Sequence, residues 1–198
     1  MRLAPGAFRY AGMVAILGVF GGIFWLPIGV GFGILSLGIL LFFRDPERVI
    51  PEKGFISPAD GKVTVIREEG NQLRIGIFMN ITDVHVNRMP SKGEITEITH
   101  SPGGHFPAFS KDAERNERVR IECDNFSIIM IAGTLARRIT TYIETGETVN
   151  RGQRIGHIAF GSRVDVLLPP SITDDELHVG LGDSVVAGET VLANSGNR

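Results

Sequence analysis

The sequence has almost no cysteine and no excess of charge of either sign. Cys123 is the only cysteine in 198 residues, which excludes an intramolecular disulfide and a metal site built from several thiolates. A lone cysteine is usually a small buried hydrophobe. The net charge is -2 and the pI about 6.2, so no basic surface for nucleic acid is predicted. The five histidines form no HExxH-type motif, and we expect no metal.

Charge is absent from one long stretch near the N-terminus, residues 11–43. A membrane-spanning helix needs about 20 apolar residues, so this stretch is long enough to cross a bilayer. It is too long for the core of a signal peptide, and no small-residue cleavage site follows it. We therefore predict a membrane-associated segment over residues 1–43 and a second domain over residues 44–198.

Pro27 divides the apolar stretch into two halves of similar length. Two arrangements fit this division: a helical hairpin bent near the proline, or one tilted and kinked span. Arg2 and Arg9 precede the stretch, and Arg44 and Arg48 follow it. Positive charge on both flanks favours a hairpin whose two ends lie in the cytoplasm. We expect the protein at the cell membrane, with its second domain on the cytoplasmic face.

Short β-like runs fill most of the second domain. The chain contains 25 glycines and ten prolines, which is typical of a turn-rich β protein. The runs cover residues 61–66, 73–79, 93–99, 118–123, 126–133 and 139–143. Only GTLARRIT (133–140) and SKDAERNER (110–118) suggest a helical turn. The expected fold is mainly β, a sandwich or barrel, with an N-terminal helical membrane segment.

The C-terminal third repeats one pattern. GETVNRGQRIGHI (146–158) and GDSVVAGETVLA (182–193) share G-[ED]-x-V-x-x-G-x-x-[IV]. Because glycine adopts the positive φ of tight turns, each copy is predicted to form a strand, a turn and a strand, as a β hairpin. The pattern resembles the hammerhead units of biotinyl and lipoyl carrier domains. Those domains display a lysine at a hairpin tip, and residues 146–193 contain no lysine, so a carrier role lacks its attachment point.

Six motifs occur in the order of one enzyme family. They are FFRDPER (42–48), SPADGKV (57–63), IFMNITDVHVNRMP (77–90), NER (116–118), GETVNRGQRIGHIAFGSRVD (146–165) and VVAGETVLA (185–193). Together they resemble the short form of the phosphatidylserine decarboxylase proenzymes, whose archaeal members act on archaetidylserine. The resemblance runs from about residue 42 to residue 193.

This resemblance implies a self-cleaving enzyme. In the family a Gly-Ser bond is cut by its own serine, which becomes a pyruvoyl group. Gly161 would then end a β chain of residues 1–161, and Ser162 would begin an α chain of residues 162–198. The pyruvoyl group would bind the amine of a serine-headgroup membrane phospholipid and accept the electron pair released with carbon dioxide. Phosphatidylserine and archaetidylserine both stay open as substrates, and so does a homodimer.

Two residues take catalytic roles from the resemblance. Asp60, in SPADGK, would assist activation of the serine by orienting a histidine. His85 shares one face with Asp83 and Asn87 if their segment is extended. Its imidazole titrates near neutrality and would supply the proton that replaces the lost carboxylate.

Arg88 departs from the long-form pattern, which has a second histidine at this position. An arginine cannot act as a base at neutral pH, but it can clamp a phosphate or carboxylate of the substrate. Three alternatives replace the second histidine: His85 takes both duties, another histidine such as His157 assists cleavage, or Asp60 works through water. We favour the first. His105, in a glycine-rich and aromatic stretch, is assigned to a substrate loop.

A function of a different class also fits part of the sequence. A non-catalytic, membrane-anchored β-hammerhead adaptor would explain the repeat and the apolar segment. It does not explain why Asp60, His85 and the Gly161-Ser162 pair all occur in the contexts of one family. The sequence therefore favours a membrane-bound, pyruvoyl-dependent lipid decarboxylase.

Overall fold

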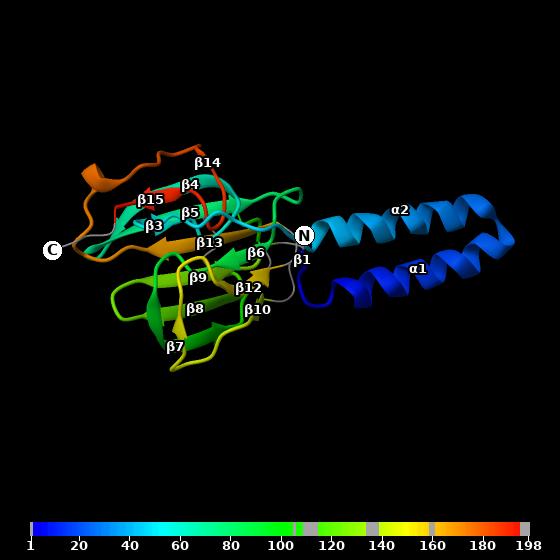
Figure 1. The fold of residues 1–198 in the computed structure, drawn as a ribbon, viewed down its shortest axis with the longest axis horizontal. Helices are drawn as coiled ribbons and strands as arrows, with labels where there is room; N and C mark the ends of the chain where they lie inside the picture. The colour runs from blue at the N-terminus through cyan, green and yellow to red at the C-terminus, as the bar shows by residue number, and fades with distance from the viewer. Residues whose placement is uncertain (1, 105, 109–114, 134–138, 159–160, 195–198) are drawn as a thin grey trace. The chain divides into compact units, whose positions relative to one another are not determined.

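The computed structural model describes residues 2–104, 106–108, 115–133, 139–158 and 161–194. The chain divides into two compact units, residues 1–47 and 48–198. In the first unit the elements are β1 (Arg2–Leu3), α1 (Ala7–Phe24), α2 (Leu26–Phe42) and β2 (Arg44–Asp45) (Figure 1).

The first unit is a helical hairpin. Trp25, in an extended conformation, separates α1 from α2, and Pro27 lies in the first turn of α2. Proline is well suited to that position because its missing N–H would have no helical partner there. The chain therefore turns between two helices at this proline and does not continue as one kinked helix. Strands β1 and β2 pair antiparallel, Arg2 with Asp45 and Leu3 with Arg44, so the two ends of the hairpin lie together.

Glycines allow the two helices to pack closely. A Cβ added to Gly29 would lie 2.9 Å from the Cα of Gly22, and one added to Gly18 would lie 2.8 Å from the Cβ of Phe32. The hydroxyl of Ser36 donates a hydrogen bond to the carbonyl of Ala11 across the pair at 2.9 Å. Close backbone approach at small residues is how helices associate in lipid, where apolar surface itself supplies no driving force between them.

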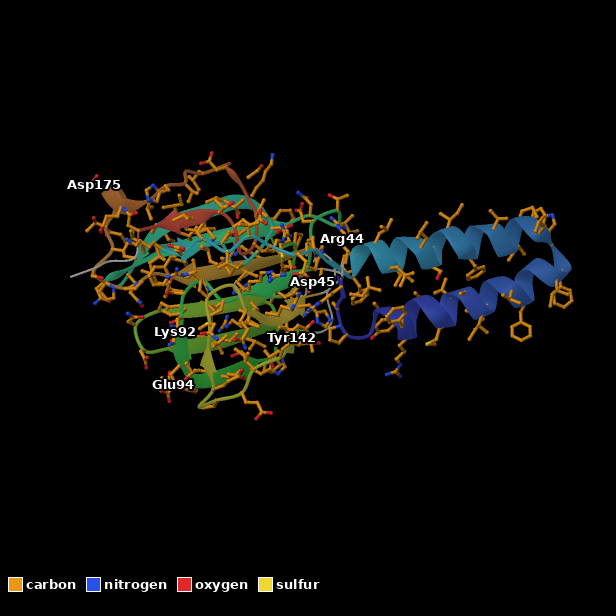
Figure 2. The ribbon with its side chains drawn as sticks, viewed as in Figure 1. Arg44, Asp45, Lys92, Glu94, Tyr142 and Asp175 are labelled. Carbon is orange, nitrogen blue, oxygen red and sulfur yellow. The ribbon has the colours of Figure 1, made fainter. Side chains whose placement is uncertain are left out.

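The outward sides of both helices are apolar and exposed. Phe24, Ile23 and Leu26 are exposed by 88%, 73% and 72%. In Figure 2 the side chains on the two helices are almost entirely carbon. Helix α1 is long and apolar enough to cross a membrane, and α2, with 17 residues, is an apolar helix just short of that length. At 1.5 Å per residue each helix is about 26 Å long, close to the roughly 30 Å of a hydrocarbon core.

The second unit is mainly β, as the sequence predicts. Its strands are β3 (Phe55–Ile56), β4 (Gly61–Glu69), β5 (Gln72–Met79), β6 (Val86–Arg88), β7 (Gly93–Ser101), β8 (Arg118–Cys123), β9 (Ser127–Ile131), β10 (Ile139–Thr141), β11 (Thr148–Val149), β12 (Arg154–Ile158), β13 (Ser162–Leu167), β14 (Ser184–Val185) and β15 (Val191–Ala193), with a short 3-10 helix η2 (Asp174–Glu176). The predicted runs at 61–66, 73–79, 93–99, 118–123, 126–133 and 139–143 coincide with β4, β5, β7, β8, β9 and β10. Most of GTLARRIT and SKDAERNER lies outside the described residues.

One curled eight-stranded sheet dominates this unit, in the order β11-β7-β8-β9-β13-β5-β4-β14 (Figure 1). A three-stranded sheet, β10-β12-β6, and a β15-β3 pair accompany it. Strand β13 lies between β9 and β5, and all six of its residues are buried. Alternate residues such as Ile75, Ile128 and Val164 enter the main core, because successive side chains of a strand point to opposite faces.

The two copies of the repeat have the predicted glycine turns but are not hairpins. Gly146, Gly152, Gly182 and Gly188 have φ of 86°, 74°, 91° and 80°, the left-handed region that glycine enters without steric cost. Within each copy, however, the two strands pair with other elements: β11 with β7 and β12 with β10 and β6 in the first, β14 with β4 and β15 with β3 in the second. The turns carry the chain from one sheet to another, and the hairpin prediction is wrong for this reason.

Candidate active site

The Gly161-Ser162 pair stands at the start of β13, in the middle of the large sheet. Gly161 has a φ of +59°, in the left-handed region that favours glycine. Ser162 is the first residue of the strand, is fully buried, and pairs with Met79 on β5. Its hydroxyl oxygen makes no hydrogen bond with any described residue. A buried hydroxyl without a partner is costly and therefore rare, so this one calls for a functional explanation.

His85 lies beside the strand that leads to this pair. Its side chain is buried, and its backbone carbonyl accepts a hydrogen bond from the N–H of Ile158, the last residue of β12. Its Nδ1 lies 2.9 Å from the carbonyl oxygen of Asp83. Because a carbonyl oxygen can only accept, Nδ1 carries a proton, and in the neutral ring Nε2 is then the basic nitrogen. The ring is thus held in the tautomer that can accept a proton through Nε2.

Asp60 precedes β4, and its side chain is bound by a guanidinium and by a backbone N–H. Arg48 donates to both of its oxygens, at 3.0 and 2.9 Å, and the backbone N–H of Ala187 donates to Oδ1 at 2.7 Å. The motif SPADGK is thereby tied to the turn of the second repeat copy. These contacts fix the position of the carboxylate, and the role of Asp60 in orienting a histidine stays a prediction.

Arg88 packs against the second glycine of both repeat copies. It is buried, and its guanidinium donates to the carbonyl of Gly152 at 3.0 Å. A Cβ added to Gly188 would lie 2.9 Å from the Cδ of Arg88. Arg88 therefore joins the turns of the two copies, and a contact with substrate stays a prediction. His105 lies outside the described residues.

Two further polar residues lie on the strands β6 and β12 that pair beside His85. Asn87 is fully buried, its amide nitrogen lies 3.6 Å from the sulfur of Met79, and its Oδ1 has no hydrogen-bond partner among the described residues. Its position on the same strand face as His85 could have identified it. His157 pairs with Val86 across β12 and β6, and its Nδ1 lies 2.6 Å from the Tyr142 hydroxyl. Burial lowers the pKa of His157, so its ring is neutral at neutral pH.

A buried ionic network follows the candidate cleavage site along β13. Asp165 is fully buried and accepts from Arg163 at 2.8 and 2.9 Å and from Arg74 at 2.7 Å. Burial alone would lower the pKa of Arg74, but the attraction of Asp165 and the hydrogen bond to Glu69 outweigh it and raise that pKa. The network locks β13 to β5 only a few residues after Ser162.

Other nucleophiles and metal sites receive little support. Burial, with the nearby Asp124 and Glu122, raises the pKa of Cys123 to about 12, so its thiol is not a thiolate at neutral pH. Within the described part of the chain, no group of three or more His, Cys, Asp or Glu side chains could hold a metal ion. Among the described residues, Ser162 has a buried hydroxyl without a hydrogen-bond partner, and its role as a nucleophile stays a prediction.

Comparison with known proteins identifies the family of this chain. A sequence model of the phosphatidylserine decarboxylase family matches residues 35–193. A protein of Halobacterium salinarum, named as an archaetidylserine decarboxylase proenzyme, is 47% identical over 190 residues, which cover 96% of this chain and 97% of that protein. A protein of Streptomyces griseus, named as a phosphatidylserine decarboxylase proenzyme, is 44% identical over 171 residues, covering 84% of this chain and 78% of the relative.

These matches place the chain among the carboxy-lyases that are made as proenzymes. Within that class, the chain belongs to the phosphatidylserine decarboxylase family. The membership rests on nearly the whole chain, so it covers the β unit that carries Gly161 and Ser162 as well as part of the hairpin. The enzyme hypothesis is thereby confirmed over the non-catalytic adaptor.

Proposed function

We propose that this chain cuts itself between Gly161 and Ser162 and then decarboxylates a serine-headgroup phospholipid to the ethanolamine lipid. The substrate is phosphatidylserine or archaetidylserine, the two lipids named in the relatives. Cleavage gives a β chain of residues 1–161 and an α chain of residues 162–198. The observation that carries the proposal is the buried Ser162 hydroxyl, which has no hydrogen-bond partner among the described residues and directly follows a left-handed glycine.

The cleavage chemistry uses only the chain itself and water. Ser162 Oγ attacks the carbonyl carbon of Gly161, the peptide C–N bond breaks, and an ester with a free Ser162 amine results. Removal of the Ser162 α-proton expels Gly161 as a carboxylate and leaves a dehydroalanine. Water then replaces the nitrogen as ammonia and leaves a terminal pyruvoyl ketone. Gly161 helps because no side chain hinders approach to its carbonyl.

Ser162 fits this group because no described residue offers its side chain a competing hydrogen bond. The pyruvoyl carbonyl, once formed, supplies an electron sink for the pair released with carbon dioxide. His85 is suited to proton transfer, since its Nδ1 is bound to Asp83 and its Nε2 is then the basic nitrogen. Asp60 would orient a histidine and stabilise its charged form, from the position that Arg48 and the N–H of Ala187 fix.

Strand pairing supports a stable complex of the two chains after cleavage. Every strand of the proposed α chain pairs with a strand of the proposed β chain: β13 with β5 and β9, β14 with β4, and β15 with β3. Strand β13 is bonded on both sides, and the ion pair of Asp165 with Arg74 also crosses the two chains. Cutting one peptide bond leaves all of these contacts in place.

The hairpin would hold the enzyme where its substrate lies. Residues 1–43 would enter the membrane, with the catalytic domain at 44–198 on the cytoplasmic face. The pairing of β1 with β2 supports a hairpin whose two ends leave the bilayer on the same side, and the positive charge on both flanks favours the cytoplasmic side.

The test is a comparison of Ser162→Ala with the wild type by intact-mass measurement and lipid decarboxylation. The wild type should give two fragments with masses for 1–161 and 162–198, the shorter blocked at its N-terminus. Ser162→Ala should stay one chain and lose activity entirely. Ser127→Ala is the control, because Ser127 is a buried serine on the neighbouring β9 whose hydroxyl binds Glu122. Active wild-type protein with an intact 161–162 bond would contradict the proposal.

A further inference from the structure

Gly133 lies directly against the peptide bond that the proposed function would cut. Strands β9 and β13 pair with Arg163 opposite Ile131, and two more residues of this register place Gly161 opposite Gly133. A Cβ added to Gly133 would overlap the carbonyl oxygen of Gly161 and lie 2.8 Å from its carbonyl carbon. The carbonyl to be attacked therefore occupies the space that a side chain at residue 133 would fill.

This close approach explains why the residue must be glycine. Gly133 does not have a positive φ, so residues other than glycine could adopt its backbone conformation. The restriction comes from the neighbouring carbonyl alone. Any side chain at this position would displace the Gly161 carbonyl or push the end of β9 away from it. The contact fixes one side of the peptide group that Ser162 must attack.

Asn116 anchors the chain at the same point. Strands β8 and β9 pair with Arg118 opposite Ile131, and the continued register places Asn116 opposite Gly133 on the side away from Gly161. The side chain of Asn116 is buried, and its amide donates to the carbonyl of Ala132 at 2.8 Å. The N–H of Ala132 donates to the Glu117 carbonyl at 2.9 Å. The N–H and the carbonyl of Ala132, the residue before Gly133, are thus both hydrogen-bonded.

The same asparagine fastens a second segment over this point. Its Oδ1 accepts from the N–H of Phe106 at 2.7 Å, and its amide donates to the Phe106 carbonyl at 2.6 Å. Two residues further on, the Cβ of Ala108 lies 3.4 Å from the position of an added Cβ at Gly133. Asn116 therefore joins the 106–108 segment to the end of β9, beside Gly133.

We propose that Gly133 and Asn116 are positioning residues for self-cleavage. Gly133 leaves the space that the Gly161 carbonyl occupies, and Asn116 fixes the backbone around that space. This inference rests on the proposed function. A carbonyl held on one face presents a fixed direction of attack to Ser162 Oγ, and a displacement of about 1 Å in such a geometry can slow a reaction roughly 100-fold. Neither residue supplies a group to the decarboxylation itself.

The experiment follows the rate at which freshly made full-length precursor is converted to two fragments, by gel and intact mass. We expect Gly133→Ala to slow cleavage by about 100-fold or more. Asn116→Asp keeps the shape of the side chain but loses the donors to Phe106 and Ala132, and we expect about a tenfold slowing or more. Circular dichroism and the melting temperature identify variants that fold.

The matched controls carry the same changes elsewhere. A Cβ added to Gly156 would overlap the carbonyl oxygen of Thr140, a collision of the same kind between β12 and β10, so Gly156→Ala tests for a general steric effect. Asn71→Asp, in the exposed turn between β4 and β5, is the control for the second variant. Both controls should cleave within about twofold of the wild type.

A second measurement separates positioning from general damage to the site. The decarboxylation rate per pyruvoyl group, measured on the fraction that has cleaved, should equal the wild-type value within about twofold in Asn116→Asp. A distorted site would lower both rates. The inference is overturned if either variant folds and cleaves at the wild-type rate, or if the rate per pyruvoyl group falls with the cleavage rate. If Gly133→Ala does not fold, Asn116→Asp decides. Failure of the wild type to cleave would instead refute the proposed function.

Discussion

The two units of this protein place their apolar side chains in opposite ways. In the hairpin the large apolar residues are mostly exposed, and those exposed range from Ile28 at 38% to Phe24 at 88%. In the described part of residues 48–198, the exposed large apolar residues are Val49, Ile81, Phe106 and Leu181. A surface as apolar as that of the hairpin requires an apolar environment, whereas the β unit buries its own core. The surface of the hairpin therefore suits a lipid environment, whereas the β unit buries most of its large apolar residues in its own core.

Glycine also serves different purposes in the two units. In the hairpin, Gly22 and Gly29 are helical and bring two backbones into contact. In the β unit, Gly146 and Gly182 have positive φ and turn the chain between sheets. Gly133 also lies close to another backbone, but it belongs to neither a helix nor a positive-φ turn. The same residue type thus serves helix packing, chain reversal and the close contact with the Gly161 carbonyl.

The largest expected effect comes from removing the hairpin from the β unit. A chain shortened to residues 44–198 should lose all binding to phospholipid vesicles, because it lacks the exposed apolar helices, yet it should still cleave at Gly161. Co-sedimentation with vesicles and a denaturing gel measure the two properties. Full-length Ser162→Ala is the reciprocal control, since it should bind vesicles and remain uncut. A shortened chain that still binds vesicles at the wild-type level would show that the hairpin is not the membrane anchor.

The next effect tests the buried charges of the β unit. Asp165→Asn leaves Arg74 and Arg163 buried without their carboxylate and should lower the free energy of unfolding by about 3–5 kcal/mol. Urea unfolding of the uncut Ser162→Ala protein in detergent measures it, so that cleavage does not complicate the transition. Glu69→Gln removes a partly exposed partner of Arg74 and should cost no more than about 1 kcal/mol. Equal losses in the two variants would contradict the importance of the buried network.

Local patterns in the sequence predicted local structure well. The alternation in RVRIEC predicted β8 at its observed bounds, 118–123, because a half-buried strand repeats every two residues. The paired glycines of the two repeat copies predicted four positive φ angles. The uncharged stretch around Pro27 suggested the two helices, and the proline now lies in the first turn of the second one.

Contacts between distant segments could not be predicted in the same way. The strands of each repeat copy pair with other strands, because pairing depends on the whole sheet and not on the local pattern. The contact of Asp60 with Arg48 and the meeting of Asn116, Gly133 and Gly161 depend on strand register across the sheet. The NER motif pointed to Asn116 only as a family feature. A single sequence carries no register, so these contacts needed the structure.

The smallest expected effect concerns helix packing inside the hairpin. Gly29→Val would force a side chain against the Cα of Gly22 and should destabilise the hairpin by about 1–3 kcal/mol. Gly31→Val is the matched control, because nothing lies within 4 Å of a Cβ at that position, while the cost of valine in a helix is the same. Trp25, the only tryptophan, lies between the two helices, so its fluorescence during thermal unfolding in detergent reports on the hairpin. Cleavage at Gly161 should proceed at the wild-type rate in both variants, since the β unit has its own core. A lower unfolding temperature in Gly29→Val alone would establish that the glycine contact stabilises the hairpin. Equal decreases in both variants would show that the effect comes only from the lower helix propensity of valine.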